Sequence, residues 1–311
     1  MTDSKEIIAK IRQKDILTIS RLITQIETSN CDTLLSSIYK YVGHSYRIGI
    51  TGPPGAGKSS ITNHLIQKYR LLNKSVAVIA VDPTSPFSGG ALLGDRLRMS
   101  SHYADANVYI RSMASRGSQG GLSYKAQDAA NVLDCARFDI VIYETVGVGQ
   151  IELDIMKSSD VVLVTLVPEA GDDIQMMKAG LMEIGNIFII NKSDRSGSNK
   201  LQTSMQQIFS LKPSSNDWEN VIVKTSAINN EGIDTLFNYI NDYYSFFKKT
   251  GLQNRVIKKR YKQQIGEIIK RDYQKYFWNN ERKKILETIL ASNRSTWPSP
   301  IDISKKLKEH E

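Results

Sequence analysis

The sequence has few of the features that mark secreted or membrane proteins. It contains two cysteines, Cys31 and Cys135, among 311 residues, which is too few for a disulfide framework and suits a reducing compartment. It has no run of 18 apolar residues, the length that would predict a transmembrane helix. The first ten residues, MTDSKEIIAK, lack the apolar core of a signal peptide. We therefore expect a cytoplasmic protein that does not associate with membranes.

Acidic residues are scarce in the last fifth of the chain. Residues 248–311 contain 17 Lys or Arg and 7 Asp or Glu, a net charge of +10, whereas the whole chain carries +9. A basic segment of this kind can bind nucleic acid or an acidic partner. Tyr and Trp residues accompany the charge, but no recognised nucleic-acid motif does. We interpret the segment as a solvated helical arm and do not expect it to bind nucleic acid.

Three regions follow one another along the chain. Residues 1–45 show apolar residues at helical spacing, and residues 247–311 are helical and basic, with a break at TWPSP. Between them, residues 46–246 alternate helical stretches with short apolar runs, namely RIGIT, VAVIAV, DIVIYE, VVLVTLV, NIFIIN and VIVKTS. This alternation predicts an α/β fold with a mostly parallel central sheet, helices on both of its faces, and helical extensions at both ends.

A phosphate-binding loop is indicated by GPPGAGKS, which matches G-x-x-x-x-G-K-[ST] and lies between a predicted strand and a predicted helix. Backbone N–H groups of such a loop and the helix N-terminus bind phosphates. We expect Lys58 to reach the β- and γ-phosphates and the Ser59 hydroxyl to bind Mg²⁺. The expected nucleotide contacts are Gly52, Pro53, Pro54, Gly55, Ala56, Gly57, Lys58, Ser59 and Ser60.

A guanine-reading motif is indicated by NKSD, which follows the apolar run NIFII. The carboxylate of Asp194 can accept hydrogen bonds from the ring N–H and the amine of guanine, and adenine presents neither donor there. We expect Asn191 to hold the base edge and its loop, and the stem of Lys192 to lie against the base. Ser226 and Ala227, in the later TSA, are expected to form a second base-contacting loop.

Three carboxylates are expected beside the phosphates, and Mg²⁺ with retained waters would offset their repulsion. Asp82 and Glu144 end predicted strands and Asp95 lies in a glycine-rich stretch, and ligands gather at the carboxyl ends of parallel strands. We predict Ser59, Asp82, Asp95 and Glu144 as metal ligands. Lys58, Asp82 and Glu144 are the expected catalytic residues.

Switch GTPases commonly have Asp-x-x-Gly where this chain has Glu144-Thr145-Val146-Gly147. The substitution keeps a carboxylate for the metal and a glycine whose N–H can bind the γ-phosphate. Gln150, a candidate switch residue, follows Gly147 by three positions. The sequence shows no certain general base or arginine finger, although Arg96, Arg111 and Arg116 lie in candidate loops. We therefore expect slow turnover in the absence of a partner.

Taken together, the motifs resemble the methylmalonyl-CoA mutase-associated GTPases of the MeaB/ArgK group. The motifs that carry the resemblance are GPPGAGKS, VDPTSPFSGGALLGDRLRM, ETVGVGQ, PEAGDDIQMMKAG and NKSD. The resemblance implies a homodimeric G-protein chaperone of an adenosylcobalamin-dependent acyl-CoA mutase, paired through its C-terminal arm. It places Asp82, Asp95 and Glu144 around Mg²⁺ and its waters, and Lys178 in a loop that signals to the mutase. We expect GTP or GDP as ligand and no direct binding of cobalamin.

Three other functions remain open from the sequence. Nickel-inserting GTPases normally have His-rich tracts, whereas the four histidines here, His44, His64, His102 and His310, are scattered. A kinase linked to an amino-acid transport system would transfer phosphate from GTP to a protein. A binding module would hold GTP without turnover.

Overall fold

The computed structural model describes residues 4–82, 99, 102, 104–114, 122–147, 149–168, 180–211 and 218–309. The chain divides between Val256 and Ile257 into two compact units. In the described ranges, no helix is both long enough and apolar enough to cross a membrane.

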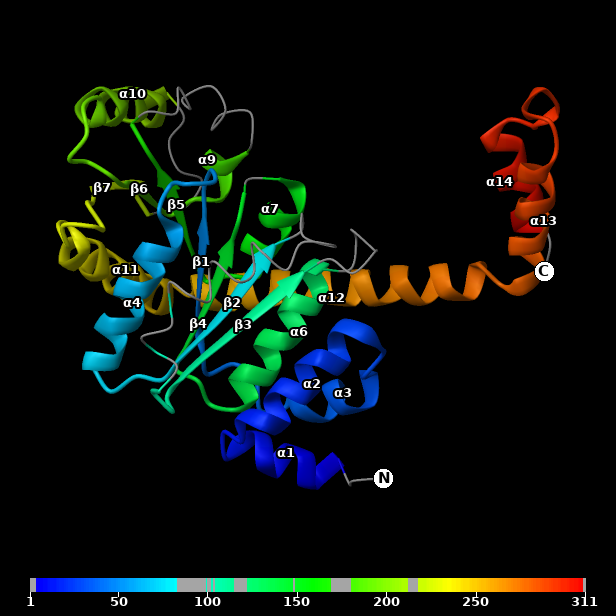
Figure 1. The fold of residues 1–311 in the computed structure, drawn as a ribbon, viewed down its shortest axis with the longest axis horizontal. Helices are drawn as coiled ribbons and strands as arrows, with labels where there is room; N and C mark the ends of the chain where they lie inside the picture. The colour runs from blue at the N-terminus through cyan, green and yellow to red at the C-terminus, as the bar shows by residue number, and fades with distance from the viewer. Residues whose placement is uncertain are drawn as a thin grey trace. The chain divides into compact units, whose positions relative to one another are not determined.

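A seven-stranded parallel sheet forms the centre of the first unit (Figure 1). Its order is β3-β2-β4-β1-β5-β6-β7, so that β1 is central between β4 and β5. The strands are β1 (Tyr46–Thr51), β2 (Val76–Asp82), β3 (Val108–Ala114), β4 (Ile140–Thr145), β5 (Val161–Leu166), β6 (Ile187–Ile190) and β7 (Val221–Lys224). This sheet confirms the predicted α/β class.

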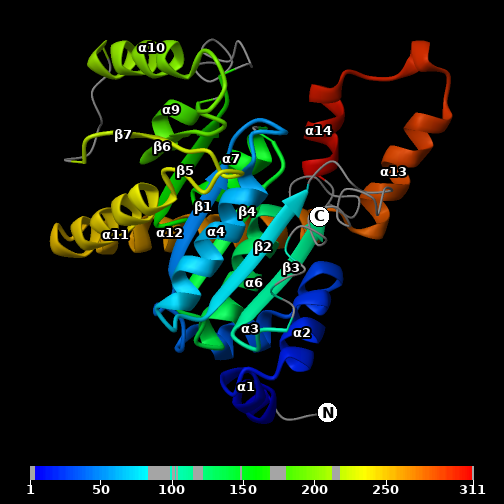
Figure 2. The same ribbon diagram turned by 60° about the vertical axis from the view of Figure 1, so that its left-hand side comes forward.

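Helices cover both faces of the sheet because alternate residues of each buried strand point to opposite faces. Ile48 and Ile50 of β1 pack in one core with α4 (Lys58–Leu71) and α11 (Ile233–Lys249). Val141 and Tyr143 of β4 pack in the other core with α6 (Leu122–Cys135). Figure 2 shows the strands side by side between these helices. The helices of this part are α4 (Lys58–Leu71), α6 (Leu122–Cys135), α7 (Gln150–Met156), α9 (Leu181–Ile184), α10 (Ser198–Leu211) and α11 (Ile233–Lys249).

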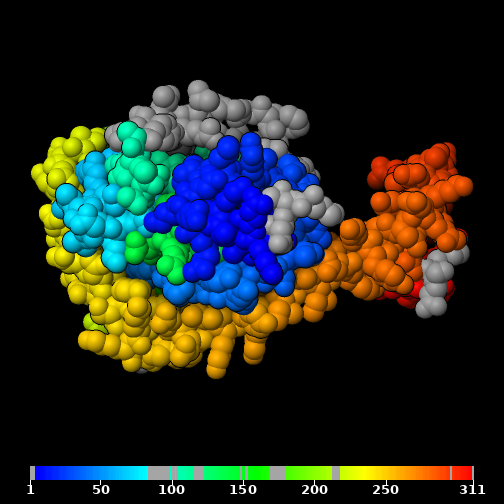
Figure 3. Space-filling model, turned by 90° about the horizontal axis from the view of Figure 1, so that it is seen from below, coloured from blue at the N-terminus to red at the C-terminus, as the bar shows by residue number. Residues whose placement is uncertain are grey.

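The N-terminal extension consists of α1 (Ser4–Arg12), α2 (Ile16–Thr28) and α3 (Asp32–Tyr39). All three helices contact α6, and their surface adjoins the sheet domain in the space-filling view (Figure 3). Asp15 caps α2, because its side chain accepts from the backbone N–H groups of Leu17 and Thr18. The buried face of α2 includes Ile19, Leu22, Ile23 and Ile26, so the predicted helical spacing matches its core face.

Strand β3 was not predicted from the sequence. Its residues VYIRSMA include polar side chains, and the candidate loop in which the sequence placed Arg111 overlaps its second half. The strand lies at the edge of the sheet and is only partly buried. An edge strand needs no continuous apolar run, which is why the apolar pattern did not reveal it.

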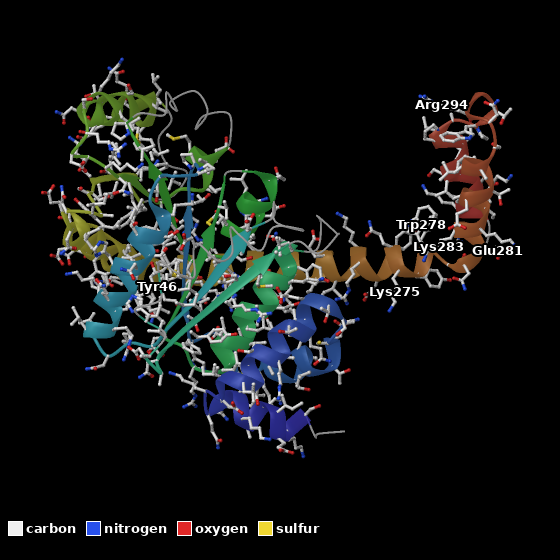
Figure 4. All side chains as sticks on the ribbon, viewed as in Figure 1. Tyr46, Lys275, Trp278, Glu281, Lys283 and Arg294 are labelled. Atoms are coloured by element: carbon white, nitrogen blue, oxygen red, sulfur yellow. The ribbon has the colours of Figure 1, made fainter. Side chains whose placement is uncertain are left out.

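The second unit is helical, and α12 (Leu252–Phe277) begins in the first unit and ends in the second. It is followed by α13 (Asn280–Ala291) and α14 (Pro300–Glu309). The helical pattern predicted one break, at 296–300, and the structure has a second at Trp278 and Asn279, near the labelled Lys275 and Glu281 in Figure 4. Asn279 causes this second break locally, because its side chain caps α13 by accepting from Arg282 N at 2.8 Å.

Candidate functional site

The described candidate residues lie at the end of the sheet that is formed by the carboxyl ends of the parallel strands (Figure 1). The phosphate loop leaves β1 at Gly52 and enters α4 at Lys58. Gly52 has φ of +142°, and a Cβ there would lie 2.0 Å from the carbonyl oxygen of Thr165 on β5. Glycine is therefore required for the loop to pass this close to the neighbouring strand.

Lys58 is buried and spans the loop. Its Nζ donates to the carbonyl oxygens of Gly52 at 2.8 Å, Pro53 at 2.9 Å and Val146 at 3.2 Å. The ammonium thus lies between the phosphate loop and the segment that follows β4. The three carbonyl oxygens stabilise the positive charge of Lys58. Phosphate oxygens bound in the loop would be favourable acceptors for the same ammonium group.

A hydroxyl and two carboxylates form the predicted metal side of the site. Ser59 Oγ donates to Glu144 Oε1 at 2.5 Å, and both side chains are buried. Asp82 is also buried and ends β2, which pairs with β4 so that Ala80 is opposite Glu144. A buried carboxylate is costly unless a cation or hydrogen bonds offset its charge. These hard oxygen donors fit Mg²⁺, which needs one or two carboxylates together with substrate phosphates.

No group of three or more His, Cys, Asp or Glu side chains that could enclose a metal occurs within the described ranges. Asp95, the other predicted ligand, lies outside the described residues.

The predicted base side lies at the ends of β6 and β7. Lys192 has φ of +56°, a left-handed conformation unusual for a residue with a side chain. Asp194 is exposed, and a hydrogen bond from the Ser226 side chain is the main cause that lowers the pKa of its carboxyl. The carboxylate form that the guanine prediction requires is therefore stabilised by the second predicted loop.

Asn191 connects the base side to the phosphate side. Its Nδ2 donates to the carbonyl oxygen of Ala56 at 2.8 Å, and its Oδ1 accepts from Thr225 Oγ1 at 3.1 Å and Ala227 N at 3.2 Å. A Cβ at Gly57, which has φ of +88°, would lie 2.2 Å from Asn191 Nδ2. In this structure Asn191 joins the two loops, whereas the sequence indicated its loop-holding role only on the base side.

Two switch candidates are described, at the end of β4 and the start of α7. The carbonyl oxygen of Gly147 accepts from Thr51 Oγ1 at 3.2 Å. Gln150 begins α7 and donates from Nε2 to Asp154 Oδ1 at 3.2 Å. Lys178 lies outside the described residues, so its predicted signalling role stays a prediction.

Arg111, one of the arginine-finger candidates, lies on β3 and pairs with Glu27 of α2 while also donating to Thr24 Oγ1 at 3.0 Å. Glu27 thus holds the Arg111 side chain against the N-terminal helices. The prediction that Arg111 lies in a loop was wrong. Arg96 and Arg116 lie outside the described residues.

Sequence reasoning did not single out His64 for a role at the site. It lies on α4, and its Nε2 is 2.7 Å from the carbonyl oxygen of Ala227 in the predicted base loop. No sequence motif carries this contact, because the two residues are 163 positions apart and meet only through the fold.

Comparisons with known proteins agree with the motifs. The profile of the family "Methylmalonyl Co-A mutase-associated GTPase MeaB" matches residues 19–282. A Pyrococcus abyssi protein, named only provisionally as a GTPase, is 43% identical over 85% of this chain and 83% of its own length. The GTPase ArgK of Escherichia coli is 30% identical over 94% of this chain and 92% of its own length.

The fold has a counterpart among solved structures. A crystal structure named LAO/AO transport system kinase superposes with a TM-score of 0.69 and 26% identity, covering 98% of this chain and 96% of that chain. Its similarity extends along almost the whole sequence, whereas the family match covers residues 19–282. The chain belongs to the methylmalonyl-CoA mutase-associated GTPase family, MeaB, as its motifs predicted.

Proposed function

We propose that this protein binds and hydrolyses GTP and serves as a chaperone of an adenosylcobalamin-dependent acyl-CoA mutase. The observation that carries the nucleotide part is the hydrogen-bonded link from Ala56 through Asn191 to Ala227. It joins a phosphate loop to a guanine-type loop at one edge of the sheet. The mutase part is supported by the family's description and by a Caenorhabditis briggsae relative named methylmalonic aciduria type A homolog, 30% identical over 80% of this chain.

In the proposed reaction, water attacks the γ-phosphorus of GTP and the bond to the β–γ bridging oxygen breaks, which yields GDP and phosphate. Lys58 would exchange its carbonyl partners for phosphate oxygens and offset charge that develops on them. Ser59, Asp82, Glu144 and Asp95 are the residues proposed to hold Mg²⁺, which would neutralise the β- and γ-phosphates when bound. Gly147 is proposed to donate its N–H to the γ-phosphate.

We expect slow turnover by the protein alone. Phosphoryl transfer depends on positioning and charge stabilisation, and among the described candidates Gln150 is held by Asp154 and Arg111 by Glu27. A mutase that orders further groups would supply what is missing. We also propose a cytoplasmic homodimer, in which residues 247–311 pair the subunits.

The nucleotide part is tested by phosphate release from GTP and ATP by the purified chain. Lys58→Ala should remove most triphosphate affinity or turnover, whereas Lys74→Ala should not, because Lys74 forms a surface ion pair with Asp139. Glu144→Gln keeps an acceptor for Ser59 but removes the charge, so it should mainly lower the rate and its Mg²⁺ dependence. An unaltered rate and Mg²⁺ dependence in Glu144→Gln would contradict the metal assignment.

The mutase part is tested by measuring the same rate with added adenosylcobalamin-dependent mutases. A stimulation of about 10-fold or more corresponds to ~1.4 kcal/mol of transition-state stabilisation. Lack of stimulation by any candidate mutase would contradict the chaperone role and leave GTP hydrolysis standing.

A kinase activity is a second candidate because the solved relative carries that name. Incubation with γ-labelled GTP separates the two, since a kinase transfers label to protein and a GTPase releases it as free phosphate. A nickel-inserting role receives less support, because His64 Nε2 bonds the carbonyl oxygen of Ala227 and His102 Nε2 bonds Asn63 Oδ1, so the two histidines have different partners. GTP binding with no phosphate release, with or without a mutase, would identify a binding module.

A further inference from the structure

His64 lies in the second turn of α4, the helix that begins at the phosphate loop. It is half-buried, and its Nε2 lies 2.7 Å from the carbonyl oxygen of Ala227. A carbonyl oxygen only accepts hydrogen bonds, so Nε2 carries the hydrogen. Both the neutral Nε2–H tautomer and the cation satisfy this contact. His64 therefore acts as a donor toward the loop that follows β7.

Ala227 uses both of its polar backbone atoms to join different elements. Its N–H donates to Asn191 Oδ1 at 3.2 Å, and its carbonyl oxygen accepts from His64. Asn191 in turn donates to the carbonyl oxygen of Ala56, which precedes α4 by two residues. These hydrogen bonds connect the phosphate loop to Asn191 after β6, Asn191 to the loop after β7, and that loop to α4, which itself follows the phosphate loop. Ala56, Asn191 and Ala227 are all buried.

The loop from Ser226 to Glu231 is internally closed. The backbone groups of these two residues form a reciprocal pair, with N···O distances of 3.0 and 3.1 Å. Gly232 follows with φ of +71°, and a Cβ there would lie 2.0 Å from the carbonyl oxygen of Lys224. The contacts from Asn191 and His64 join this closed loop to the rest of the site.

We propose that His64 is a positioning residue for guanine recognition, which fastens the loop after β7 to the phosphate-binding helix. The proposal rests on the function proposed above. Holding Ala227 fixes the adjacent Ser226, whose side chain hydrogen-bonds the Asp194 carboxylate. Asp194 is thereby kept oriented for the base while α4 holds the phosphates. His64 itself touches no nucleotide in this scheme.

The test compares three substitutions on one helix. His64→Leu removes the donor, whereas His64→Gln retains one, because the Gln Nε2 is also four bonds from Cα. Gln67→Leu is the matched control, since Gln67 is exposed on the same helix. The measurement is the GDP dissociation constant by titration calorimetry. We expect affinity about 3- to 10-fold weaker in His64→Leu, as for loss of one hydrogen bond, and near wild type in the other two.

A second background separates positioning from a general loss of stability. In an Asp194→Ala background, adding His64→Leu should weaken GDP binding by less than about 2-fold, because the group being positioned is gone. Thermal unfolding of the nucleotide-free variants shows whether each is folded. If His64→Leu denatures, the comparison of His64→Gln with His64→Ala at lower temperature provides the same readout.

Three outcomes would overturn this inference and leave the proposed function standing: unchanged GDP affinity in His64→Leu, an equal loss with and without Asp194, or failure of His64→Gln to recover the affinity that His64→Leu loses. If the wild-type chain bound no guanine nucleotide, the proposed function would fail and the inference would fail with it.

Discussion

Among single residues, Asp194 has the most specific proposed task, because it must present a carboxylate to the base. It is exposed, and the hydrogen bond from Ser226 lowers its pKa below the ordinary aspartate value. A lowered pKa means that the ionised form of Asp194 persists to lower pH than that of an ordinary aspartate. From about pH 8 to about pH 5, protonation of Asp194 should therefore not weaken guanine binding.

Asp194→Asn should weaken GTP binding and favour xanthosine triphosphate. The amide can donate to the carbonyl that xanthine has in place of the guanine amine, whereas it offers the guanine amine a poorer partner. A change of about 10-fold or more in the ratio of the two affinities is expected. Competition binding with both nucleotides measures this ratio.

The matched control is Asp242→Asn, an identical change at an exposed position on α11. It should leave the preference for GTP as in wild type. An unchanged preference in Asp194→Asn would remove this residue from base recognition.

At the level of elements, the phosphate loop is shaped by two glycines that differ in their surroundings. Gly55 and Gly57 both have positive φ, +76° and +88°. A Cβ at Gly55 would meet nothing within 4 Å, whereas one at Gly57 would lie 2.2 Å from Asn191 Nδ2. Backbone strain is therefore common to both positions, and displacement of Asn191 is specific to Gly57.

Gly55→Ala and Gly57→Ala should both destabilise the nucleotide-free protein by about 1–2 kcal/mol through backbone strain. Gly57→Ala should cost about 1–3 kcal/mol more, because moving Asn191 weakens its hydrogen bonds to Ala56, Thr225 and Ala227. Urea unfolding of the two variants measures the difference. Equal stabilities would mean that Asn191 accommodates the methyl group and that its contacts contribute little.

In the C-terminal unit, Arg282 holds three helices together. Its Nε donates to the carbonyl oxygen of Leu307 on α14 at 2.8 Å, and one Nη donates to that of Phe277 at 3.1 Å. The guanidinium also lies over the Phe277 ring, 4.8 Å from its centroid. Arg282 is buried, so its loss would leave both carbonyl groups without this charged donor.

Arg282→Ala should accelerate amide hydrogen exchange throughout α14, by about 10-fold or more if at least ~1.4 kcal/mol of local stability is lost. Lys283→Ala, its exposed neighbour on α13, is the control and should leave exchange unchanged. Slow exchange of α14 in Arg282→Ala would show that packing of Leu307 alone is sufficient.

For the whole molecule, the central question is how a mutase would change the rate at the nucleotide site. Lys178 follows the acidic run PEAGDD, and the sequence predicts that it signals between the mutase and the nucleotide site. Lys178→Ala should keep GTP affinity and lose the stimulation of hydrolysis by the mutase. Phosphate release with and without the mutase, for wild type and variant, measures this.

Lys200→Ala, an exposed lysine of α10, controls for the loss of one positive charge. It should be stimulated as strongly as wild type. Equal stimulation in Lys178→Ala would take that residue out of the signalling role.

The local motifs were readable because each is a continuous segment with its own chemistry. The apolar runs predicted six strands of the sheet, and GPPGAGKS predicted the loop between β1 and α4. Strand β3 was missed because an edge strand can carry Arg111 and Ser112 without losing its pairing to β2. The break at Asn279 was missed because a single capping residue is a weak signal within a long polar helical pattern.

The fold class, the family and the chemical types of the candidate residues follow from the amino-acid order, since they depend on short-range patterns of polarity, glycine and charge. Which of these residues meet depends on how the chain folds. Asn191 lies 135 positions from Ala56 and His64 lies 163 from Ala227, and no local pattern encodes either pairing. These contacts exist because parallel strands bring their carboxyl ends to one edge of the sheet, where hydrogen bonds form between segments distant in sequence.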